Sequence, residues 1–213
     1  MAGVSNNFKT LTFAHGVHPE EYKELTSGHA IRRMPFVEEY TLPLSQHIGA
    51  PSVPLVKKGQ SVRRGEKIAD ANGFVSVALH SPVDGVVSDI GIFNTPKGEV
   101  KPGIRIKTDQ FSIQEHRENP IDWRSIEKAE FIKHLQDAGI VGLGGAAFPA
   151  HVKFSIPEGM TCKYVMLNGC ECEPFLTADD RTMVEYPDEI IQGIEIIDHF
   201  LKPEKTFIGI EAN

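Results

Sequence analysis

The sequence predicts two folded parts, a small all-β unit followed by an α/β unit. Short β-rich runs separated by turn residues fill residues 52–92, and a helical spacing of apolar residues begins after residue 120. A strand, a helical region and a second strand then follow one another between residues 163 and 210. Alternation with period two is typical of strands, and a spacing of three to four residues is typical of amphipathic helices.

Composition and charge limit the class of protein. The 213 residues include 29 acidic and 22 basic side chains, which gives a formal charge of −7. A nucleic-acid-binding protein needs a basic surface that displaces counterions, so we expect no nucleic-acid partner. No stretch approaches the roughly 18 uninterrupted apolar residues of a membrane helix. We expect a cytosolic chain, for which docking on a membrane partner stays open.

The all-β unit is expected over roughly residues 40–105, after an irregular N-terminal arm at 1–39. Gly-containing turn signals separate its short apolar runs. Val75, Val77 and Leu79 alternate with smaller residues, and this spacing predicts a strand. The unit therefore consists of short strands joined by tight turns.

This stretch is similar to the lipoyl and biotinyl carrier domains, whose fold is the barrel-sandwich hybrid. The resemblance rests on the V-x-x-G-x-x-V-x-x-G-x-x-I spacing from Val56 to Ile68 and on the S-P-x-x-G turn at 81–85. Carrier domains place a modified lysine on an exposed hairpin shortly before that turn, where this chain has Asn-Gly-Phe at 72–74. We expect Phe74 on or near an exposed hairpin and no covalent lipoyl or biotinyl group.

The α/β unit is expected over residues 120–213. Its predicted elements are a helix over 122–139 that Ser125 caps and Gly139 ends, a strand over 163–168, a short helix capped by Thr177 or Asp179, a helix from Pro187, and a strand over 205–210. This order predicts a right-handed βαβ unit. A parallel sheet ending with the last strand leaves an edge to cover, so we expect a fragment of a longer protein.

Two segments contain the residues of a candidate ligand site. The first reads GLGGAAFP from Gly142 to Pro149 and is followed by Lys153; glycines let a ligand approach the main chain, and the lysine adds a positive charge. By itself this segment is equally well explained as a plain loop-to-helix turn. The second reads NGCECEP over 168–174, directly after a predicted strand. Ligands bind beyond the carboxyl ends of strands in open α/β sheets, although a solvated acidic loop is the simpler explanation of this segment alone.

The three cysteines do not form a metal-binding pattern. Cys162, Cys170 and Cys172 contain no C-x-x-C pair, whereas zinc and iron–sulfur sites usually need four ligands. We expect them to be small buried residues in a reducing compartment, with no metal bound.

Together the two segments resemble the flavin-binding core of the NADH-oxidising subunit of respiratory complex I, and more closely the C subunit of the Rnf ferredoxin:NAD⁺ electron-transport complex. The resemblance rests on G-L-G-G-A-x-F-P-x-H-V-K at 142–153, N-G-x-E-C-E-P-x-L-T-A-D-D-R at 168–181, G-I-E-A-N at 209–213 and S-Q-H-I-G-A-P at 45–51. It covers nearly the whole chain in the family's order. It implies a barrel-sandwich hybrid followed by a Rossmann-like, truncated domain that binds FMN and NADH.

The resemblance also implies the site. FMN would be bound noncovalently by Gly142, Gly144, Gly145, Lys153, Asn168, Glu171 and Glu211. Glu173 would be the catalytic residue that holds the nicotinamide of NAD(H) against the flavin. The resemblance further implies other subunits of an ion-translocating membrane complex as partners, and a peripheral place on the cytoplasmic side of the bacterial plasma membrane.

This sequence departs from the family pattern in three respects. Ala147 stands where the family usually has glycine, and Cys170 stands where the complex I relatives have aspartate. The two C-x-x-C-x-x-C-x-x-x-C-P runs that bind [4Fe–4S] clusters are not in this sequence, so the resemblance places the clusters in a further region, and we expect this chain alone to be inactive. The alternative is a non-catalytic scaffold that resembles the A subunit of the sodium-pumping NADH:quinone reductase.

Overall fold

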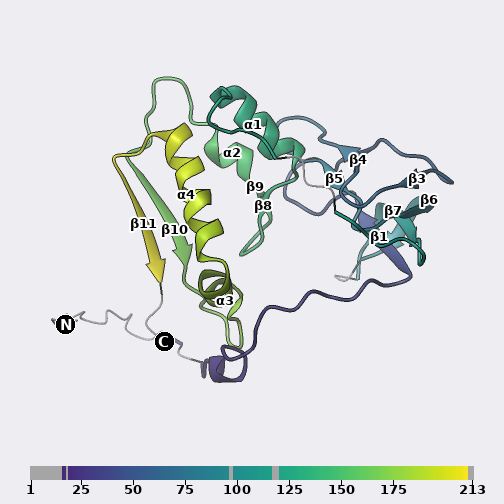
Figure 1. The fold of residues 1–213 in the computed structure, drawn as a ribbon, viewed down its shortest axis with the longest axis horizontal. Coiled ribbons are helices and arrows are strands. Elements are labelled where there is room, and N and C mark those ends of the chain that lie inside the picture. Colours follow the sequence, from purple (N-terminus) through teal and green to yellow (C-terminus); the bar gives the residue numbers. More distant parts are fainter. Residues whose placement is uncertain (1–15, 18, 96–97, 117–119, 211–213) are drawn as a thin grey trace. The chain divides into compact units, whose positions relative to one another are not determined.

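The computed structural model describes residues 16–17, 19–95, 98–116 and 120–210 (Figure 1). It divides into two compact units, each described below by itself. One unit comprises Met1–Arg32, Leu167–Ile190 and Ile208–Asn213, and the other comprises Arg33–Met166 and Ile191–Phe207. The domain ranges 1–39, 40–105 and 120–213 stay a prediction.

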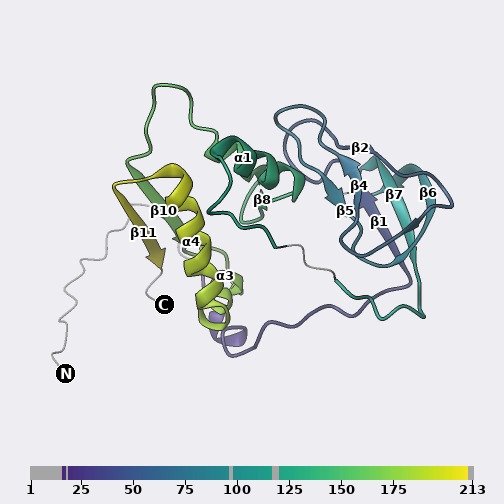
Figure 2. The ribbon, with the colours of Figure 1, turned by 45° about the horizontal axis from the view of Figure 1, so that its top comes forward.

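Two antiparallel sheets form the all-β part (Figure 2). The larger sheet has the order β1 (Glu39–Pro43), β7 (Val100–Thr108), β6 (Gly85–Asn94), β3 (Ser61–Val62), and the smaller has the order β2 (Val53–Pro54), β4 (Lys67–Asp70), β5 (Leu79–His80). Every pair of neighbouring strands is antiparallel. The expected all-β unit is therefore confirmed, although β6 with 10 residues and β7 with 9 residues are longer than the short strands that the sequence predicts.

A compact apolar core lies in this all-β part. Ile68, Val83, Val87, Ile104 and Ile106 are all 0% exposed and belong to one cluster of buried side chains. Burying a side chain of this size contributes roughly 1.5–3 kcal/mol relative to leaving it in water. The core thus accounts for the stability of a unit whose strands are mostly short.

Residues 71–78 form the loop that joins β4 to β5, and here the strand prediction is wrong. Val75 and Val77 alternate in sequence, but only Leu79 begins a strand. An alternating strand would expose every second side chain to solvent. Ser76, Val77 and Ala78 are instead all buried. The backbone carbonyl of Val75 bonds to the N–H of Ala50, and that of Ser76 to the side chain of Gln136, instead of to a neighbouring strand.

Gly49 explains why the segment at 47–52 approaches this loop so closely. Its φ of +110° lies in the region that favours glycine, and a Cβ there would be 2.0 Å from the carbonyl oxygen of Val75. Phe74, at the far end of the loop, is 59% exposed. The expectation of an exposed Phe74 on a hairpin is confirmed.

Helix α1 spans Lys128–Asp137 and begins later than the sequence predicts. Ser125 does not cap it, because its N–H and hydroxyl both bond to the carbonyl of Asp122 in a separate turn. Glu127 is the N-cap, with an extended backbone (φ −80°, ψ 157°). Gly139 follows the helix with φ +75°, which confirms the predicted end of the helix.

A cluster of charged side chains joins α1 to strand β4. Nζ of Lys67 and Nζ of Lys133 each lie 2.9 Å from Oδ1 of Asp137. Burial alone would raise the pKa of Asp137, but the hydrogen bonds from the two lysines outweigh burial and hold the pKa below its ordinary value. The hydrogen bond to Asp137 raises the pKa of Lys67.

We expect Asp137→Asn to lower the free energy of unfolding at pH 7 by about 1 kcal/mol or less, because a pair this exposed is screened by solvent. A carboxyl whose pKa is lowered by folding stabilises the protein above its unfolded pKa, near 3.9, and loses this effect as pH falls through the folded pKa. The difference between variant and wild type should therefore shrink below about pH 4. Urea unfolding at pH 7 and at pH 3 measures this difference in the free energy of unfolding, with Glu158→Gln in an exposed loop as the control. A difference that is the same at both pH values would contradict a stabilising role of the Asp137 carboxylate.

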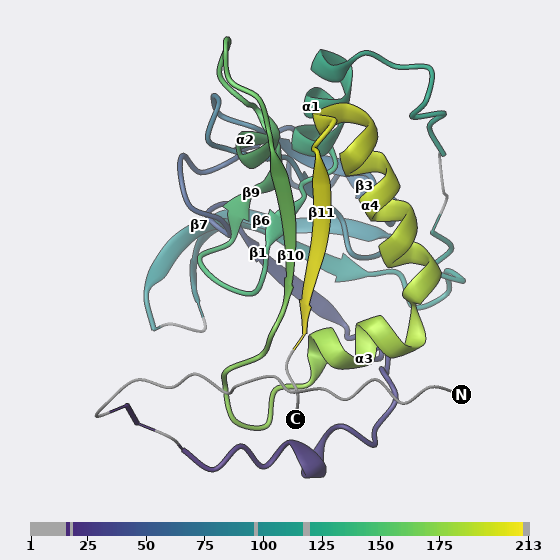
Figure 3. The same ribbon diagram turned by 90° about the vertical axis from the view of Figure 1, so that its left-hand side faces the viewer.

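The remaining elements include a strand–helix–helix–strand sequence: β10 (Tyr164–Gly169), α3 (Ala178–Glu185), α4 (Pro187–Leu201) and β11 (Lys205–Ile210). β10 and β11 are hydrogen-bonded neighbours that run in the same direction (Figure 3). Between α1 and β10 lie β8 (Val141–Gly142), β9 (Phe148–Pro149) and α2 (Ala150–Phe154), and a 3₁₀ turn covers Lys23–Leu25. The α/β class is confirmed.

Among the described residues, the helices are too short or too polar to cross a bilayer.

Candidate functional site

The glycine-rich segment forms the tip of a small hairpin. β8 and β9 are antiparallel, with Val141 opposite Pro149 and Gly142 opposite Phe148. Gly144 and Gly145 lie in the exposed turn between the strands, and no other atom comes within 4 Å of where a Cβ on either would lie. The main chain of this turn is therefore open to a flat ligand.

Lys153 lies against the same hairpin. Its side chain comes from helix α2, which directly follows β9. Its Nζ is 2.8 Å from the position that a Cβ on Gly142 would occupy, so the ammonium group lies close to the main chain of Gly142 and would shift if a larger residue stood there. The structure thus brings a positive charge next to the open glycine turn.

Ala147 has a backbone conformation that favours glycine. Its φ is +52°, in the left-handed region where an L-residue with a Cβ is strained. The resemblance stated in the sequence analysis implies a glycine at this position. Ala147, which departs from the family pattern, is thus a strained residue of the hairpin.

Ala147→Gly should raise the free energy of unfolding by about 0.5–1 kcal/mol, because relief of the left-handed strain exceeds the entropy cost of glycine. Ala138→Gly is the matched control, since Ala138 ends helix α1 with φ −75° and gains nothing from glycine. Chemical denaturation of both variants checks the sign. Equal destabilisation by the two substitutions would contradict the assignment of strain.

In the other unit, the acidic segment follows strand β10. Asn168 is exposed, and its Oδ1 accepts a hydrogen bond of 3.1 Å from the N–H of Cys170. Glu171 is only 6% exposed. Its two carboxylate oxygens accept the N–H groups of Asp179 (2.8 Å) and Asp180 (3.0 Å), so Glu171 caps the start of α3.

Glu173 has a different environment from Glu171. The chain bends at Glu173 and turns at Pro174 and Phe175, and Phe175 has a φ of +65°. Glu173 is exposed, whereas Glu171 is buried. An extended loop would have turned both carboxylates to one side, and this bend separates them.

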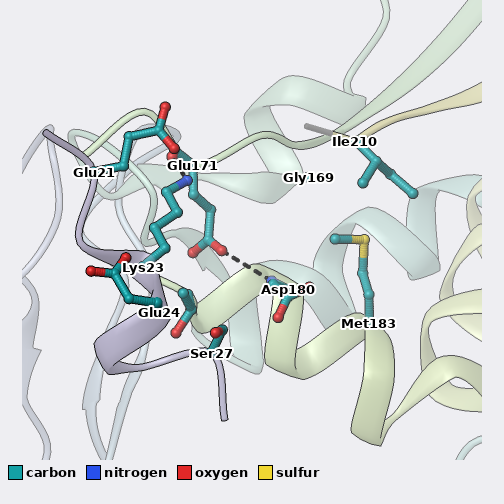
Figure 4. Close-up of a pocket in the computed structure, with 10 residues that line it drawn as sticks. Glu21, Lys23, Glu24, Ser27, Gly169, Glu171, Asp180, Met183 and Ile210 are labelled. Carbon is teal, nitrogen blue, oxygen red and sulfur yellow. Dashed lines mark hydrogen bonds between the residues drawn. The ribbon is translucent and has the colours of Figure 1, made fainter. Parts of the chain in front are cut away.

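A cavity of about 370 Å³ lies at the carboxyl ends of β10 and β11 (Figure 4). Gly169 and Ile210, the last residues of the two strands, line it together with Met183 and Asp180 of α3. This is the edge of the sheet at which the sequence predicts ligand binding. Burial, and beyond it the charge of Glu171, raises the pKa of the neighbouring Asp179.

The N-terminal arm closes one side of this cavity, which sequence analysis missed. The ammonium group of Lys23 donates to the carbonyl of Glu171 (Figure 4). Tyr22 stacks on Phe175 with ring centroids 5.1 Å apart, and Nη1 of Arg181 donates to the carbonyl of Ser27 at 3.1 Å. No local pattern in residues 21–31 indicates these contacts, because their partners lie far along the chain.

The comparisons with known proteins divide the chain in the same order as the sequence motifs. Residues 11–111 match the RnfC barrel sandwich hybrid domain, and residues 135–213 match the Nuo51 FMN-binding domain. The chain is thus similar to RnfC in its first matched range and to Nuo51 in its second. The second match contains the glycine-rich hairpin, Lys153 and the acidic segment after β10.

Curated relatives of this chain have names that agree with these matches. The C subunit of a proton-translocating ferredoxin:NAD(+) oxidoreductase complex from Clostridium ljungdahlii is 38% identical, over 95% of this chain and 44% of the relative. The Na(+)-translocating counterpart from Acetobacterium woodii is 38% identical, over 97% of this chain and 47% of the relative. The C subunit of an ion-translocating oxidoreductase complex from Haemophilus influenzae is 36% identical, over 100% and 33%. The chain thus spans a third to about half of these relatives.

The structure brings together some of the predicted site residues. Gly142, Gly144, Gly145 and Lys153 share one hairpin and its helix. In the other unit, Asn168 lies near the end of β10, and Glu171 and Glu173 follow that strand. Glu211 lies outside the described residues. A second feature that the sequence did not predict is the capping role of Glu171, because the N-cap signals at 177 and 179 pointed to other residues.

The cysteines differ from the expectation of uniformly buried thiols. Cys172 is exposed, and Cys162 and Cys170 are half-buried. Cys172 lies in the irregular loop after β10, where no core forms around it. Within the described part of the chain, histidine, cysteine and carboxylate side chains form no group of three that could hold a metal ion.

Proposed function

We propose that this chain binds FMN noncovalently and exchanges electrons with NAD(H), as the flavin-binding part of an ion-translocating ferredoxin:NAD⁺ oxidoreductase. The match of residues 135–213 to an FMN-binding domain and the names of the relatives support this proposal. The observation that carries it is the ammonium group of Lys153 held over Gly142, beside an open glycine turn.

The glycine hairpin fits a flavin mononucleotide in two respects. Gly144 and Gly145 present main chain without side chains, which suits contact with a planar ring system. Lys153 supplies the positive charge that a phosphate group requires. In the proposal these residues and Gly142 hold FMN, and Asn168 and Glu211 add hydrogen bonds to it.

The acidic segment positions the substrate in the proposal. When bound, FMN supplies the redox chemistry by accepting two electrons from NADH or returning them to NAD⁺. Glu173 is exposed at the bend of its loop and accepts a hydrogen bond from the nicotinamide carboxamide, which orients the ring. Glu171 holds that loop in shape through its bonds to the start of α3.

The rest of the proposal concerns the longer protein. Two [4Fe–4S] clusters in a further region would exchange electrons with the flavin, and other components of the membrane complex would be the partners. The protein then lies at the cytoplasmic face of the bacterial plasma membrane as a peripheral component. A full-length protein whose clusters are assembled but whose flavin is missing should fail to oxidise NADH.

The test is flavin uptake by the full-length protein. FMN added to the purified, flavin-free protein should bind one to one, and its absorbance should bleach when NADH is added anaerobically. A full-length protein that takes up no FMN would favour the scaffold alternative. A protein that binds FMN but is not reduced by NADH would retain the flavin site and reject the nicotinamide role of Glu173.

A further inference from the structure

The loop at 73–78 of the barrel is fastened to the helices that border the glycine hairpin. Nε2 of Gln136, in α1, donates to the carbonyls of Gly73 (3.0 Å) and Ser76 (3.1 Å). The N–H of Ala78 donates to the carbonyl of Gln136 at 3.1 Å. One side of the loop is therefore tied to α1 by three hydrogen bonds.

His151, in α2, makes the second tie. Its ring is 1% exposed, and its Nε2 lies 2.6 Å from the carbonyl oxygen of Phe74. A carbonyl only accepts, so Nε2 carries the proton and donates. The ring of Phe74 packs edge-on against the imidazole, with centroids 5.7 Å apart. Among the described residues, the buried Nδ1 has no hydrogen-bond partner.

The opposite side of the same loop is fixed to the segment at 47–52. Nε2 of His47 accepts the N–H of Val77 at 3.3 Å, and the hydroxyl of Ser52 donates to the carbonyl of Val77 at 2.8 Å. The N–H of Ala50 bonds to the carbonyl of Val75 at 3.0 Å. The loop thus lies between the barrel and the two helices and cannot swing as a carrier arm does.

These contacts reach the glycine hairpin directly. His151 is the second residue of α2, and Lys153 is two residues further along the same short helix. The N–H of Ile48 bonds to the carbonyl of Ala147 at 3.4 Å, and the N–H of Ala150 bonds to the carbonyl of Ile140 at 2.9 Å. The end of the hairpin therefore bonds to the segment at 47–52 and adjoins helix α2, and both of these are hydrogen-bonded to the loop at 73–78.

We propose that the loop at 73–78 is a bracket that sets the conformation of the glycine hairpin and of Lys153, with His151 and Gln136 as its positioning residues. The inference rests on the proposed FMN site. The barrel then contributes to flavin affinity without touching the flavin. When a bracket bond is lost, only a fraction of the molecules present the binding conformation, and the apparent dissociation constant rises by the inverse of that fraction.

The decisive variant is His151→Phe in the full-length protein, which keeps a ring in the buried site but removes the donor to Phe74. We expect the FMN dissociation constant, measured by quenching of flavin fluorescence, to rise by about tenfold, equivalent to about 1.4 kcal/mol. His151→Gln restores an N–H donor and should bring the constant back toward wild type. Gln136→Ala, at a half-buried position, should also raise the FMN dissociation constant.

Val87→Ala is the matched control, because it leaves a cavity in the barrel core and removes no bracket bond. It should lower the melting temperature and leave the FMN dissociation constant unchanged at a temperature where all variants are folded. If His151→Phe binds FMN as tightly as wild type, the bracket has no positioning role. The same conclusion follows if Val87→Ala raises the FMN dissociation constant as much as His151→Phe does.

Hydrogen exchange in the flavin-free protein separates this inference from the proposed function. His151→Phe should accelerate exchange of the amides at 142–154 more than Val87→Ala does, whether or not FMN binds. A wild-type protein that takes up no FMN overturns the proposed function, and exchange at 142–154 that is the same in His151→Phe and wild type overturns the bracket. Faster exchange together with unaltered FMN affinity would also reject the positioning role.

Discussion

Gly145→Val is expected to abolish FMN binding by the full-length protein while leaving its fold intact. In the proposed site the flavin lies against the main chain at Gly145, and a branched side chain would occupy that space. The protein itself has room for the valine, because no other atom lies within 4 Å of the new Cβ position and φ is not in the left-handed region. Loss of flavin would then come from steric exclusion and not from unfolding.

Flavin stoichiometry after gel filtration measures this effect, with the melting temperature of the flavin-free protein as the check on folding. Gly193→Val is the matched control, since Gly193 also has open space around its Cβ position but lies in helix α4. It should retain a full complement of FMN. A Gly145→Val protein that keeps its flavin would remove the glycine turn from the site.

Glu173→Gln is expected to raise the NADH concentration needed for flavin reduction by about ten- to a hundredfold. A hydrogen bond from a neutral ligand to a carboxylate contributes roughly 1.5–3 kcal/mol, and each 1.4 kcal/mol is a factor of ten. Because Glu173 is exposed, the substitution leaves no buried group unpaired. Flavin content should therefore stay near that of the wild type.

Stopped-flow bleaching of the flavin at a series of NADH concentrations gives the half-saturating concentration for each variant. Glu189→Gln, another exposed carboxylate in the first turn of α4, is the control for the change in net charge and should behave as wild type. If Glu173→Gln loses its flavin, or if it is reduced as readily as wild type, then Glu173 does not position the nicotinamide.

Elements with a local sequence signal were predicted well. The strand at 205–210 coincides with β11, Pro187 begins α4, and Gly139 ends the stretch that contains α1. In each case neighbouring residues decide the conformation: proline fixes φ at the first helical position, and glycine accepts the left-handed turn after a helix. The sequence predicts a glycine-rich loop at 142–149, and the structure shows there a small hairpin of β8 and β9; the role of Lys153 beside it stays a prediction.

Elements whose partners lie far along the chain were not predicted. Val75 and Val77 have the spacing of a strand, but polar groups at 47–52 and Gln136 take their backbone bonds. The start of α3 has Thr177 in the N-cap position, yet the structure shows no bond from its side chain. Glu171 caps the helix from a loop that precedes it. Known N-cap patterns place the capping side chain next to the first turn, so they do not predict a cap from Glu171.

The attachment of the N-terminal arm has a consequence for how the chain folds during synthesis. Residues that contact one another there are 148 to 154 positions apart. At a synthesis rate of about 5–20 residues per second, the arm waits roughly 7–30 s before its partners leave the ribosome. All barrel strands lie between Glu39 and Thr108, so the barrel emerges well before. A segment that is synthesised before the barrel is thus among the last to reach its native contacts, and Tyr22 stays exposed to chaperones and proteases until then.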